Sequence, residues 1–168
     1  MSSFGTDEYI RQIVMEYSKT LYRIAFTTLR SIPDSEDIVQ EVFLRLLKTR
    51  PQFASREHEK AWLIRVAVNL SRNRLRHSSR SELPLELCPE SVNELVQDDF
   101  AERDGSLLQA VLALPEKYRT IIHLYYYEDY TIGQIAQILA IPSATVGTRL
   151  ARGRAMLRKM LEGGYFGA

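Results

Sequence analysis

Residues 131–157 constrain the fold of this chain more than any other stretch, because their apolar side chains recur at helical spacing on both sides of a short break. The apolar positions before and after the break are Ile132, Ile135, Ala136 and Leu139, then Val146, Leu150 and Leu157. This spacing predicts two amphipathic helices joined by a turn at Ile141. Thr131 followed three residues later by Gln134 fits a capping box at the start of the first helix. The segment therefore predicts a helix-turn-helix.

The second of these helices has a polar row opposite its apolar stripe. The row consists of hydroxyl side chains and arginines: Thr145, Thr148, Arg149 and Arg152. A helix that packs on a partner helix and presents such groups outward has the shape and chemistry that enter the major groove of DNA. An ordinary helical hairpin with solvated arginines is the alternative. The segment favours DNA binding.

The composition narrows the class of protein. Hydrophobic residues make up 45% of the 168 positions and charged residues 26%, as in soluble globular proteins. No apolar run approaches the roughly 18 residues of a membrane span, and no secretory signal is apparent at the start of the chain. The single cysteine, Cys88, fits a reducing compartment, and His58, His77 and His123 lack metal-ligand spacing. We therefore expect a cytoplasmic protein without a metal or a cofactor.

Charge is divided unevenly along the chain. Residues 1–80 hold 14 Lys and Arg against 9 Asp and Glu, and residues 106–168 hold 7 against 4. Residues 81–105 hold 1 against 8, and they also contain two prolines and have weak periodicity. That composition suits a linker better than a packed element. We predict two small helical domains, residues 1–80 and 106–168, joined by an acidic linker at 81–105.

Three amphipathic helices are predicted in the first domain, and the chain has no strand alternation long enough to predict a sheet, so the fold class is all-α. The first helix spans about residues 8–30, with an apolar stripe at Ile10, Ile13, Val14, Tyr17, Leu21, Ile24, Ala25 and Leu29. The second is predicted to be capped by Asp34 and to bury Ile38, Val42, Leu46 and Leu47. Its outward positions are Asp37, Gln40, Glu41, Leu44 and Arg45.

The third helix, about residues 57–77, carries a second basic surface. Its outward stripe contains Arg65, Asn69, Arg72 and Arg76, with Asn73 beside it. Trp62 lies near the helix start and next to the loop that contains Phe53. Positive charge, aromatic faces and an amide are what single-stranded or flipped bases require. For Trp62 itself a place in the core is the better prediction, whereas for the arginines nucleic-acid contact is favoured over a merely solvated face.

Three segments in this order resemble a bacterial RNA polymerase sigma factor of the extracytoplasmic-function type, which has only regions 2 and 4. Asp37, Gln40, Glu41 and Phe43 match the Asp-x-x-Gln-Glu-x-Phe pattern of region 2.2. The segment WLIRVAVNLSRNRLR is similar to regions 2.3 and 2.4, and the stretch from LPEKYRT to RAMLRKML is similar to region 4. The resemblance covers nearly all of residues 8–162.

The resemblance implies a role for each surface. The core-binding residues would be Asp37, Gln40, Glu41 and Leu44, docked on the clamp helices of the largest polymerase subunit. The −10 element would be opened and read by Phe53, Trp62, Arg65, Asn69, Arg72, Asn73 and Arg76, with a flipped base held by the loop at 50–55. The −35 element would be read by Ser143, Thr145, Gly147, Thr148, Arg149 and Arg152.

Further partners are implied by the same kinship. They are the flap of the second-largest polymerase subunit, promoter DNA and an anti-sigma factor. The linker would thread through the polymerase, although a solvated tether is an equal alternative. Three departures from the family pattern concern the −35 preference: Ala140 replaces the usual turn glycine, Gly147 a common lysine and Gln134 a common glutamate. A left-handed Ala140 would cost roughly 1 kcal/mol.

Two rival functions can be distinguished from this one. A stand-alone helix-turn-helix regulator would explain residues 131–157 but leaves the outward Gln40, Glu41 and Leu44 without a role. An enzyme is disfavoured, because the sequence shows no Gly-rich phosphate loop, no carboxylate pair in a pocket and no Cys–His nucleophile arrangement.

Overall fold

The computed structural model describes residues 7–77 and 105–162, and every regular element in those residues is an α-helix. The fold is all-α, as the sequence predicted. Contacts divide the chain into two compact units, unit 1 at residues 1–79 and unit 2 at residues 80–168. Of the predicted acidic linker at 81–105, only the last residue, Gly105, is among the described residues. The rest of the linker, including Cys88, lies outside them. Within the described ranges, no helix has the length and apolar content to cross a membrane.

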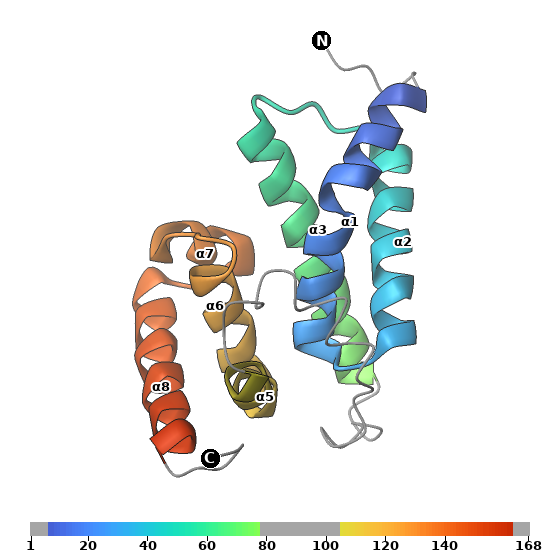
Figure 1. The fold of residues 1–168 in the computed structure, drawn as a ribbon. Helices are drawn as coiled ribbons and strands as arrows, with labels where there is room; N and C mark the ends of the chain where they lie inside the picture. The colour runs from blue at the N-terminus through green and yellow to red at the C-terminus, as the bar shows by residue number, and fades with distance from the viewer. Residues whose placement is uncertain (1–6, 78–104, 163–168) are drawn as a thin grey trace. The chain divides into compact units, whose positions relative to one another are not determined.

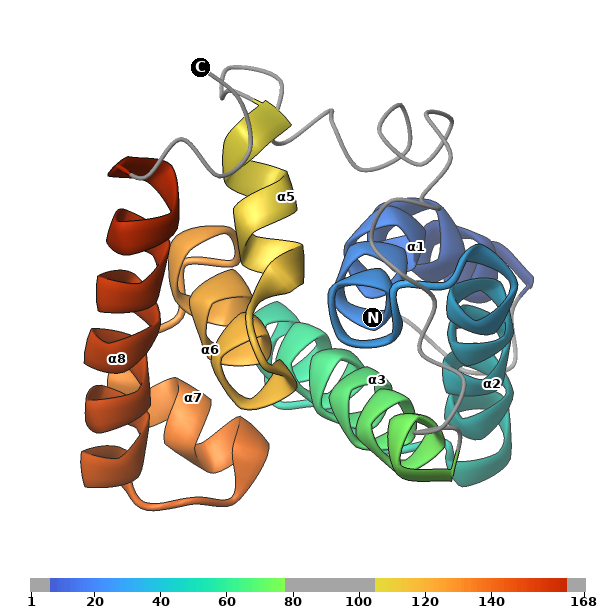
Figure 2. The same ribbon diagram turned by 90° about the horizontal axis from the view of Figure 1, so that it is seen from below.

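Unit 1 is a three-helix bundle in its described part, in which each helix contacts the other two (Figures 1 and 2). The helices are α1 (Asp7–Leu29), α2 (Ile32–Thr49) and α3 (Arg56–His77). The largest fully buried side chains come from all three helices: Leu21, Ile24 and Phe26, then Ile38 and Leu46, then Leu63 and Ile64. Burial of these side chains is the main favourable term that holds the bundle together.

Two edges of the predicted apolar stripes are exposed. Val14 is 36% exposed and Leu47 is 41% exposed, so the prediction that they face the core is wrong. Each follows a buried residue, Ile13 or Leu46, and a step of one residue rotates a side chain by about 100° around the helix. Neither partner helix reaches that far around α1 or α2.

The start of α2 also differs from the prediction. The N-cap is Ser31, whose Oγ accepts a hydrogen bond from the Asp34 backbone N–H at 3.4 Å. Pro33 lies in the first turn rather than before the helix, where its missing N–H costs nothing. Asp34 is therefore not the cap but an acidic residue of the first turn, where it complements the helix dipole.

A polar contact ties α1 to α3. The hydroxyls of Tyr9 and Tyr17 donate hydrogen bonds to the two carboxylate oxygens of Glu59, at 2.7 Å and 3.2 Å. Burial and the neighbouring Glu59 carboxylate raise the pKa of Tyr17 to about 12 and raise that of Tyr9 as well. Glu59 thus receives two donors from a neighbouring helix, which sets how the start of α3 sits on α1.

Unit 2 packs its helices along α8 (Figure 2). The helices are α5 (Gly105–Ala113), α6 (Glu116–Tyr126), α7 (Ile132–Leu139) and α8 (Ser143–Glu162). Its core includes Leu114, Ile121, Leu124, Ile135 and Val146, each at most 1% exposed. Of the predicted stripe of residues 131–157, Ile132 is half-buried, and the others are buried: Ile135, Ala136, Leu139, Val146, Leu150 and Leu157.

The helix-turn-helix has the predicted local geometry. The Thr131 backbone N–H donates to Oε1 of Gln134 at 2.9 Å, and the Gln134 backbone N–H donates to Oγ1 of Thr131 at 3.1 Å, which completes the capping box. Ala140 is left-handed, with φ of 55°, and ends α7 with its N–H on the Ala136 carbonyl. The predicted capping box is confirmed, and Ala140 has the left-handed conformation that costs roughly 1 kcal/mol for a residue other than glycine.

The two glycines of α8 have opposite surroundings. A Cβ at Gly147 would have no heavy atom within 4 Å. A Cβ at Gly153 would lie 3.2 Å from Cγ1 of Ile122 and 3.5 Å from Cβ of Tyr118, because α8 and α6 approach closely there. Gly153 is therefore a packing residue, which the sequence analysis did not identify.

Candidate nucleic-acid interface

The predicted stripe on α3 faces outward. Arg65, Asn69, Asn73 and Arg76 are exposed, and Arg72 is half-buried. The inward side of the same helix carries Leu63, Ile64, Ala67 and Val68, all fully buried. The bundle therefore orients α3 so that its guanidinium and amide groups are presented together along one face, as phosphate and base contacts require.

Arg74 of α3 has a different place. Its Nη2 lies 3.0 Å from Oδ1 of Asp34 and 3.2 Å from Oδ2 of Asp37, both in the first turns of α2. This contact is not predictable from the sequence, since the pairing depends on how α2 and α3 pack. The guanidinium connects the end of the candidate DNA-binding helix to the start of the candidate polymerase-binding helix.

An aromatic cluster lies at the start of α3. Phe53 is 5.8 Å from Trp62 between ring centroids and 5.4 Å from the His58 ring, which it meets edge to face. Trp62 is half-buried rather than buried, so its predicted place in the core is wrong. The reason is that Trp62 lies one residue before the buried Leu63 and packs against the loop instead. His58 was not among the predicted site residues.

The outward face of α2 combines acidic, amide and apolar groups. Gln40, Glu41 and Leu44 are exposed as predicted, and Leu44 is 63% exposed. Leu47, one turn further along, extends the apolar part of the face. Asp37 lies at the start of this face, and its carboxylate forms an ion pair with Arg74. Exposed leucines rimmed by polar groups are typical of a protein-binding surface.

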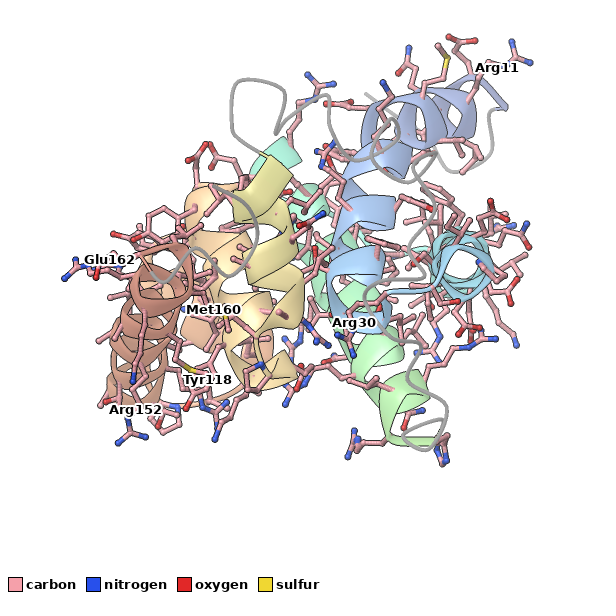
Figure 3. All side chains as sticks on the ribbon, turned by 60° about the horizontal axis from the view of Figure 1, so that its bottom comes forward. Arg11, Arg30, Tyr118, Arg152, Met160 and Glu162 are labelled. Carbon is pink, nitrogen blue, oxygen red and sulfur yellow. The ribbon has the colours of Figure 1, made fainter. Side chains whose placement is uncertain are left out.

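The residues of the candidate recognition face of α8 differ in solvent exposure. Ser143, Thr148 and Arg152 are exposed, whereas Thr145, Gly147 and Arg149 are half-buried. The Thr148 hydroxyl donates to the Ala144 carbonyl at 3.0 Å, which leaves its oxygen lone pairs for an outside donor. Arg152 extends away from α8 (Figure 3).

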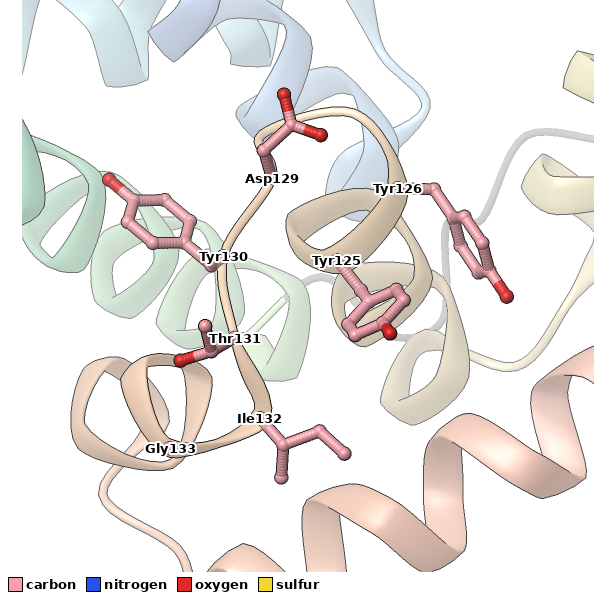
Figure 4. A pocket seen from close by; sticks show the side chains of 7 residues that line it. All are labelled: Tyr125, Tyr126, Asp129, Tyr130, Thr131, Ile132 and Gly133. Atoms are coloured by element: carbon pink, nitrogen blue, oxygen red, sulfur yellow. The ribbon is translucent and has the colours of Figure 1, made fainter.

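The opposite flank of α8 meets two tyrosines of α6. The Arg154 guanidinium lies 5.3 Å from the Tyr125 ring centroid and 5.4 Å from that of Tyr126. Tyr126 is 39% exposed. Both rings line an open hollow of about 640 Å³ together with the segment leading into α7: Asp129, Tyr130, Thr131, Ile132 and Gly133 (Figure 4).

Comparison with known proteins adds the family. Residues 13–81 match the family described as sigma-70 region 2, and residues 104–157 match sigma-70, region 4. The chain is 32% identical over 171 residues to the ECF RNA polymerase sigma factor SigW of Bacillus subtilis, a match that covers 94% of this chain and 91% of SigW. It is 28% identical over 148 residues to RNA polymerase sigma factor SigV of the same species, with 88% of each chain covered.

Solved structures are similar in fold. One is CnrH in complex with the cytosolic domain of CnrY, with a TM-score of 0.65, 21% identity and coverage of 95% of this chain and 91% of that chain. Another is the sigma factor RpoE in complex with the anti-sigma factor NepR from Bartonella quintana, with a TM-score of 0.63, 18% identity and coverage of 90% and 96%. At these identities the likeness supports the all-α fold.

Proposed function

The chain belongs to the ECF RNA polymerase sigma factors of the sigma-70 family, which direct transcription initiation, and we propose that it divides this work between two helical domains. One domain would bind core polymerase and the −10 element, and the other would bind the −35 element. The observation that carries the proposal is the presence of outward polar and cationic faces on α3 and α8, one in each unit. In this division the acidic residues 81–105 serve as the linker.

The polymerase-binding surface would be the face of α2 formed by Gln40, Glu41, Leu44 and Leu47. Its two exposed leucines supply apolar area, and the amide and carboxylate at its edge supply orientation. The partner surface would be the clamp helices of the largest polymerase subunit. Asp37 would act at the edge of this surface, since Arg74 already neutralises part of its charge.

The −10 surface would be the exposed stripe of α3 together with the aromatic cluster at its start. Arg65, Arg72 and Arg76 would follow the phosphates of the opened strand, while Asn69 and Asn73 offer amides to base edges. Phe53 and Trp62 would provide faces for an unstacked base, because both rings are only half-buried.

The −35 surface would be the recognition face of α8. Arg152 and the half-buried Arg149 can reach guanine edges or phosphates, and the hydroxyls of Ser143 and Thr145 can donate to the same acceptors. The Thr148 oxygen can instead accept from a base amino group, because its proton is donated to the Ala144 carbonyl. Gly147 would leave a space on this face where a larger side chain fits without a clash. This gap would contribute to the chain's own −35 preference.

Further partners and the subcellular location of the protein follow from the same proposal. One structural relative is complexed with an anti-sigma factor, which supports a similar partner for this chain. The flap of the second-largest polymerase subunit would contact unit 2. Because polymerase and promoter DNA are in the cytoplasm, the protein would act there, and the polymerase rather than this chain would perform the chemistry.

Run-off transcription with purified core polymerase tests the proposal. We expect promoter-directed initiation that depends on both this protein and core polymerase. The rival function is a stand-alone helix-turn-helix regulator. A protein that adds no initiation and footprints a palindrome without polymerase would establish the rival instead.

A further inference from the structure

The loop between α2 and α3 is held at both ends by short-range contacts. At its start, Arg50 is left-handed with φ of 48° and donates its N–H to the Leu46 carbonyl, which ends α2. At its end, Oγ of Ser55 accepts the backbone N–H of His58 at 3.1 Å, and the Ser55 carbonyl accepts the N–H of Glu59. Ser55 therefore acts as the N-cap of α3.

The side chain of His58 turns back from the helix onto this loop. Its Nδ1 accepts the backbone N–H of Ala54 at 3.0 Å. In a capping box the third helical residue accepts the N–H of the cap itself, as Gln134 does for Thr131 in unit 2. Here His58 reaches one residue further out and binds the loop. The acceptor is the Nδ1 atom, so the bond uses the side of the imidazole that faces the loop.

The same imidazole contacts the aromatic part of the loop. Its ring meets the Phe53 ring at a centroid distance of 5.4 Å and an interplanar angle of 90°. Phe53 in turn meets Trp62 at 5.8 Å. One side chain therefore fixes the backbone at Ala54 and the ring at Phe53, and it does so from the first turn of a helix whose other face is in the core.

We propose that His58 is the positioning residue of this loop, which orders Phe53 and Ala54 for capture of an unstacked promoter base. A base that leaves the duplex loses stacking energy, and a preordered aromatic face reduces the further cost of ordering the protein. The inference rests on the proposed −10 role of the loop. It assigns a role to His58, which contacts the loop and not the base.

Two variants of His58 and one control separate the backbone contact of this residue from its ring contact. His58→Ala removes both the acceptor and the ring. His58→Gln keeps an oxygen acceptor of the kind normally found at this helical position but lacks the ring. His77→Ala is the matched control, since His77 is exposed at the other end of α3, away from the loop. A fourth variant, Phe53→Ala, marks the promoter position that depends on the loop.

The test uses the full chain with core polymerase and a promoter library randomised in the −10 element, in which each template carries a transcribed barcode that identifies its −10 sequence. The barcodes are read by sequencing the run-off transcripts. Wild type should enrich one base at the position that Phe53→Ala leaves random. His58→Ala should reduce that enrichment about tenfold at the same position only, His58→Gln should restore it in part, and His77→Ala should match wild type.

The outcomes distinguish this inference from the proposed function. Wild-type enrichment without any loss in His58→Ala would refute the role of His58. So would an equal loss at every −10 position together with a lowered melting temperature, because a residue needed only for folding behaves that way. If wild type enriches no base at all in the −10 element, the proposed function itself fails.

Discussion

The arginines of α3 and α8 have different surroundings, although both helices present a cationic face. Arg74 of α3 forms ion pairs with Asp34 and Asp37 of its own bundle. In the described part of unit 2, by contrast, no arginine of α8 forms an ion pair, and Arg154 lies over tyrosine rings instead. Part of the charge of α3 therefore holds helices together, whereas the charge of α8 remains available to a polyanion.

The packing of the two helices explains this difference. The start of α3 is tied to α1 through Glu59, which accepts hydrogen bonds from two tyrosines. The middle of α8 instead lies so close to α6 that only a glycine, Gly153, fits without displacing Ile122. A helix held by close apolar contact needs no side-chain charge for its position, so its outer face can be used entirely for binding.

The largest expected effect concerns the charge of α8. Replacing Arg149 and Arg152 with Ala should reduce −35-dependent initiation by about 1–3 kcal/mol for each base-reading contact, roughly 5- to 150-fold. Arg158→Ala is the control, because Arg158 is exposed but lies outside the recognition face. Run-off transcription on promoters with and without a −35 element gives the measurement. An equal loss on both promoters would mean that these arginines do not read the −35 element.

The close approach of α8 and α6 gives the next prediction. Gly153→Val should lower the free energy of unfolding of unit 2 by about 1–3 kcal/mol, because the new methyl groups meet Ile122. Gly147→Ala, on the same helix but with open space around it, should raise stability by up to about 1 kcal/mol. Urea denaturation followed by circular dichroism measures both. Similar changes in the two variants would contradict the difference in packing.

The proposed polymerase-binding face of α2 gives a third prediction. Glu41→Lys should weaken association with core polymerase about tenfold, or about 1.4 kcal/mol, because a charge on the rim of the interface is reversed. The fold should not change, since Glu41 is exposed and its ion pair with Arg45 is a long, exposed contact of 3.8 Å. Glu8→Lys, an exposed position on α1 rather than α2, is the control. If Glu41→Lys leaves the affinity for core polymerase unchanged, this face of α2 is not the polymerase interface.

The smallest expected effect concerns Arg74. Arg74→Ala should lower the stability of unit 1 by less than about 1 kcal/mol, because the pair is more than a third exposed and water screens it. The loss should shrink at high salt. Arg152→Ala should leave stability unchanged at any salt concentration. If both variants lose the same salt-dependent stability, the arginines of α3 and α8 do not differ in their contribution to the fold.

Local sequence signals predicted the helix-turn-helix well. The capping box of Thr131 and Gln134 involves neighbours in the chain, and the left-handed turn at Ala140 follows from the end of a short helix. The outward position of Gln40, Glu41 and Leu44 was also predictable, since helical periodicity separates them from Ile38 and Val42. The exposure of Val14 and Leu47 was not, because periodicity gives the direction of a side chain but not the width of the face that a neighbour covers.

The amino-acid sequence by itself determined the helical periodicity, the caps of α7 and the two cationic stripes, because each depends on residues within a few positions of one another. Only the tertiary structure decided the ion pairs of Arg74, the close approach at Gly153 and the contact of His58 with Phe53 and Ala54. The first two depend on the angle and spacing between packed helices, and the third on how a loop folds back on a helix. These quantities come from the simultaneous burial of several apolar faces, which no single segment specifies.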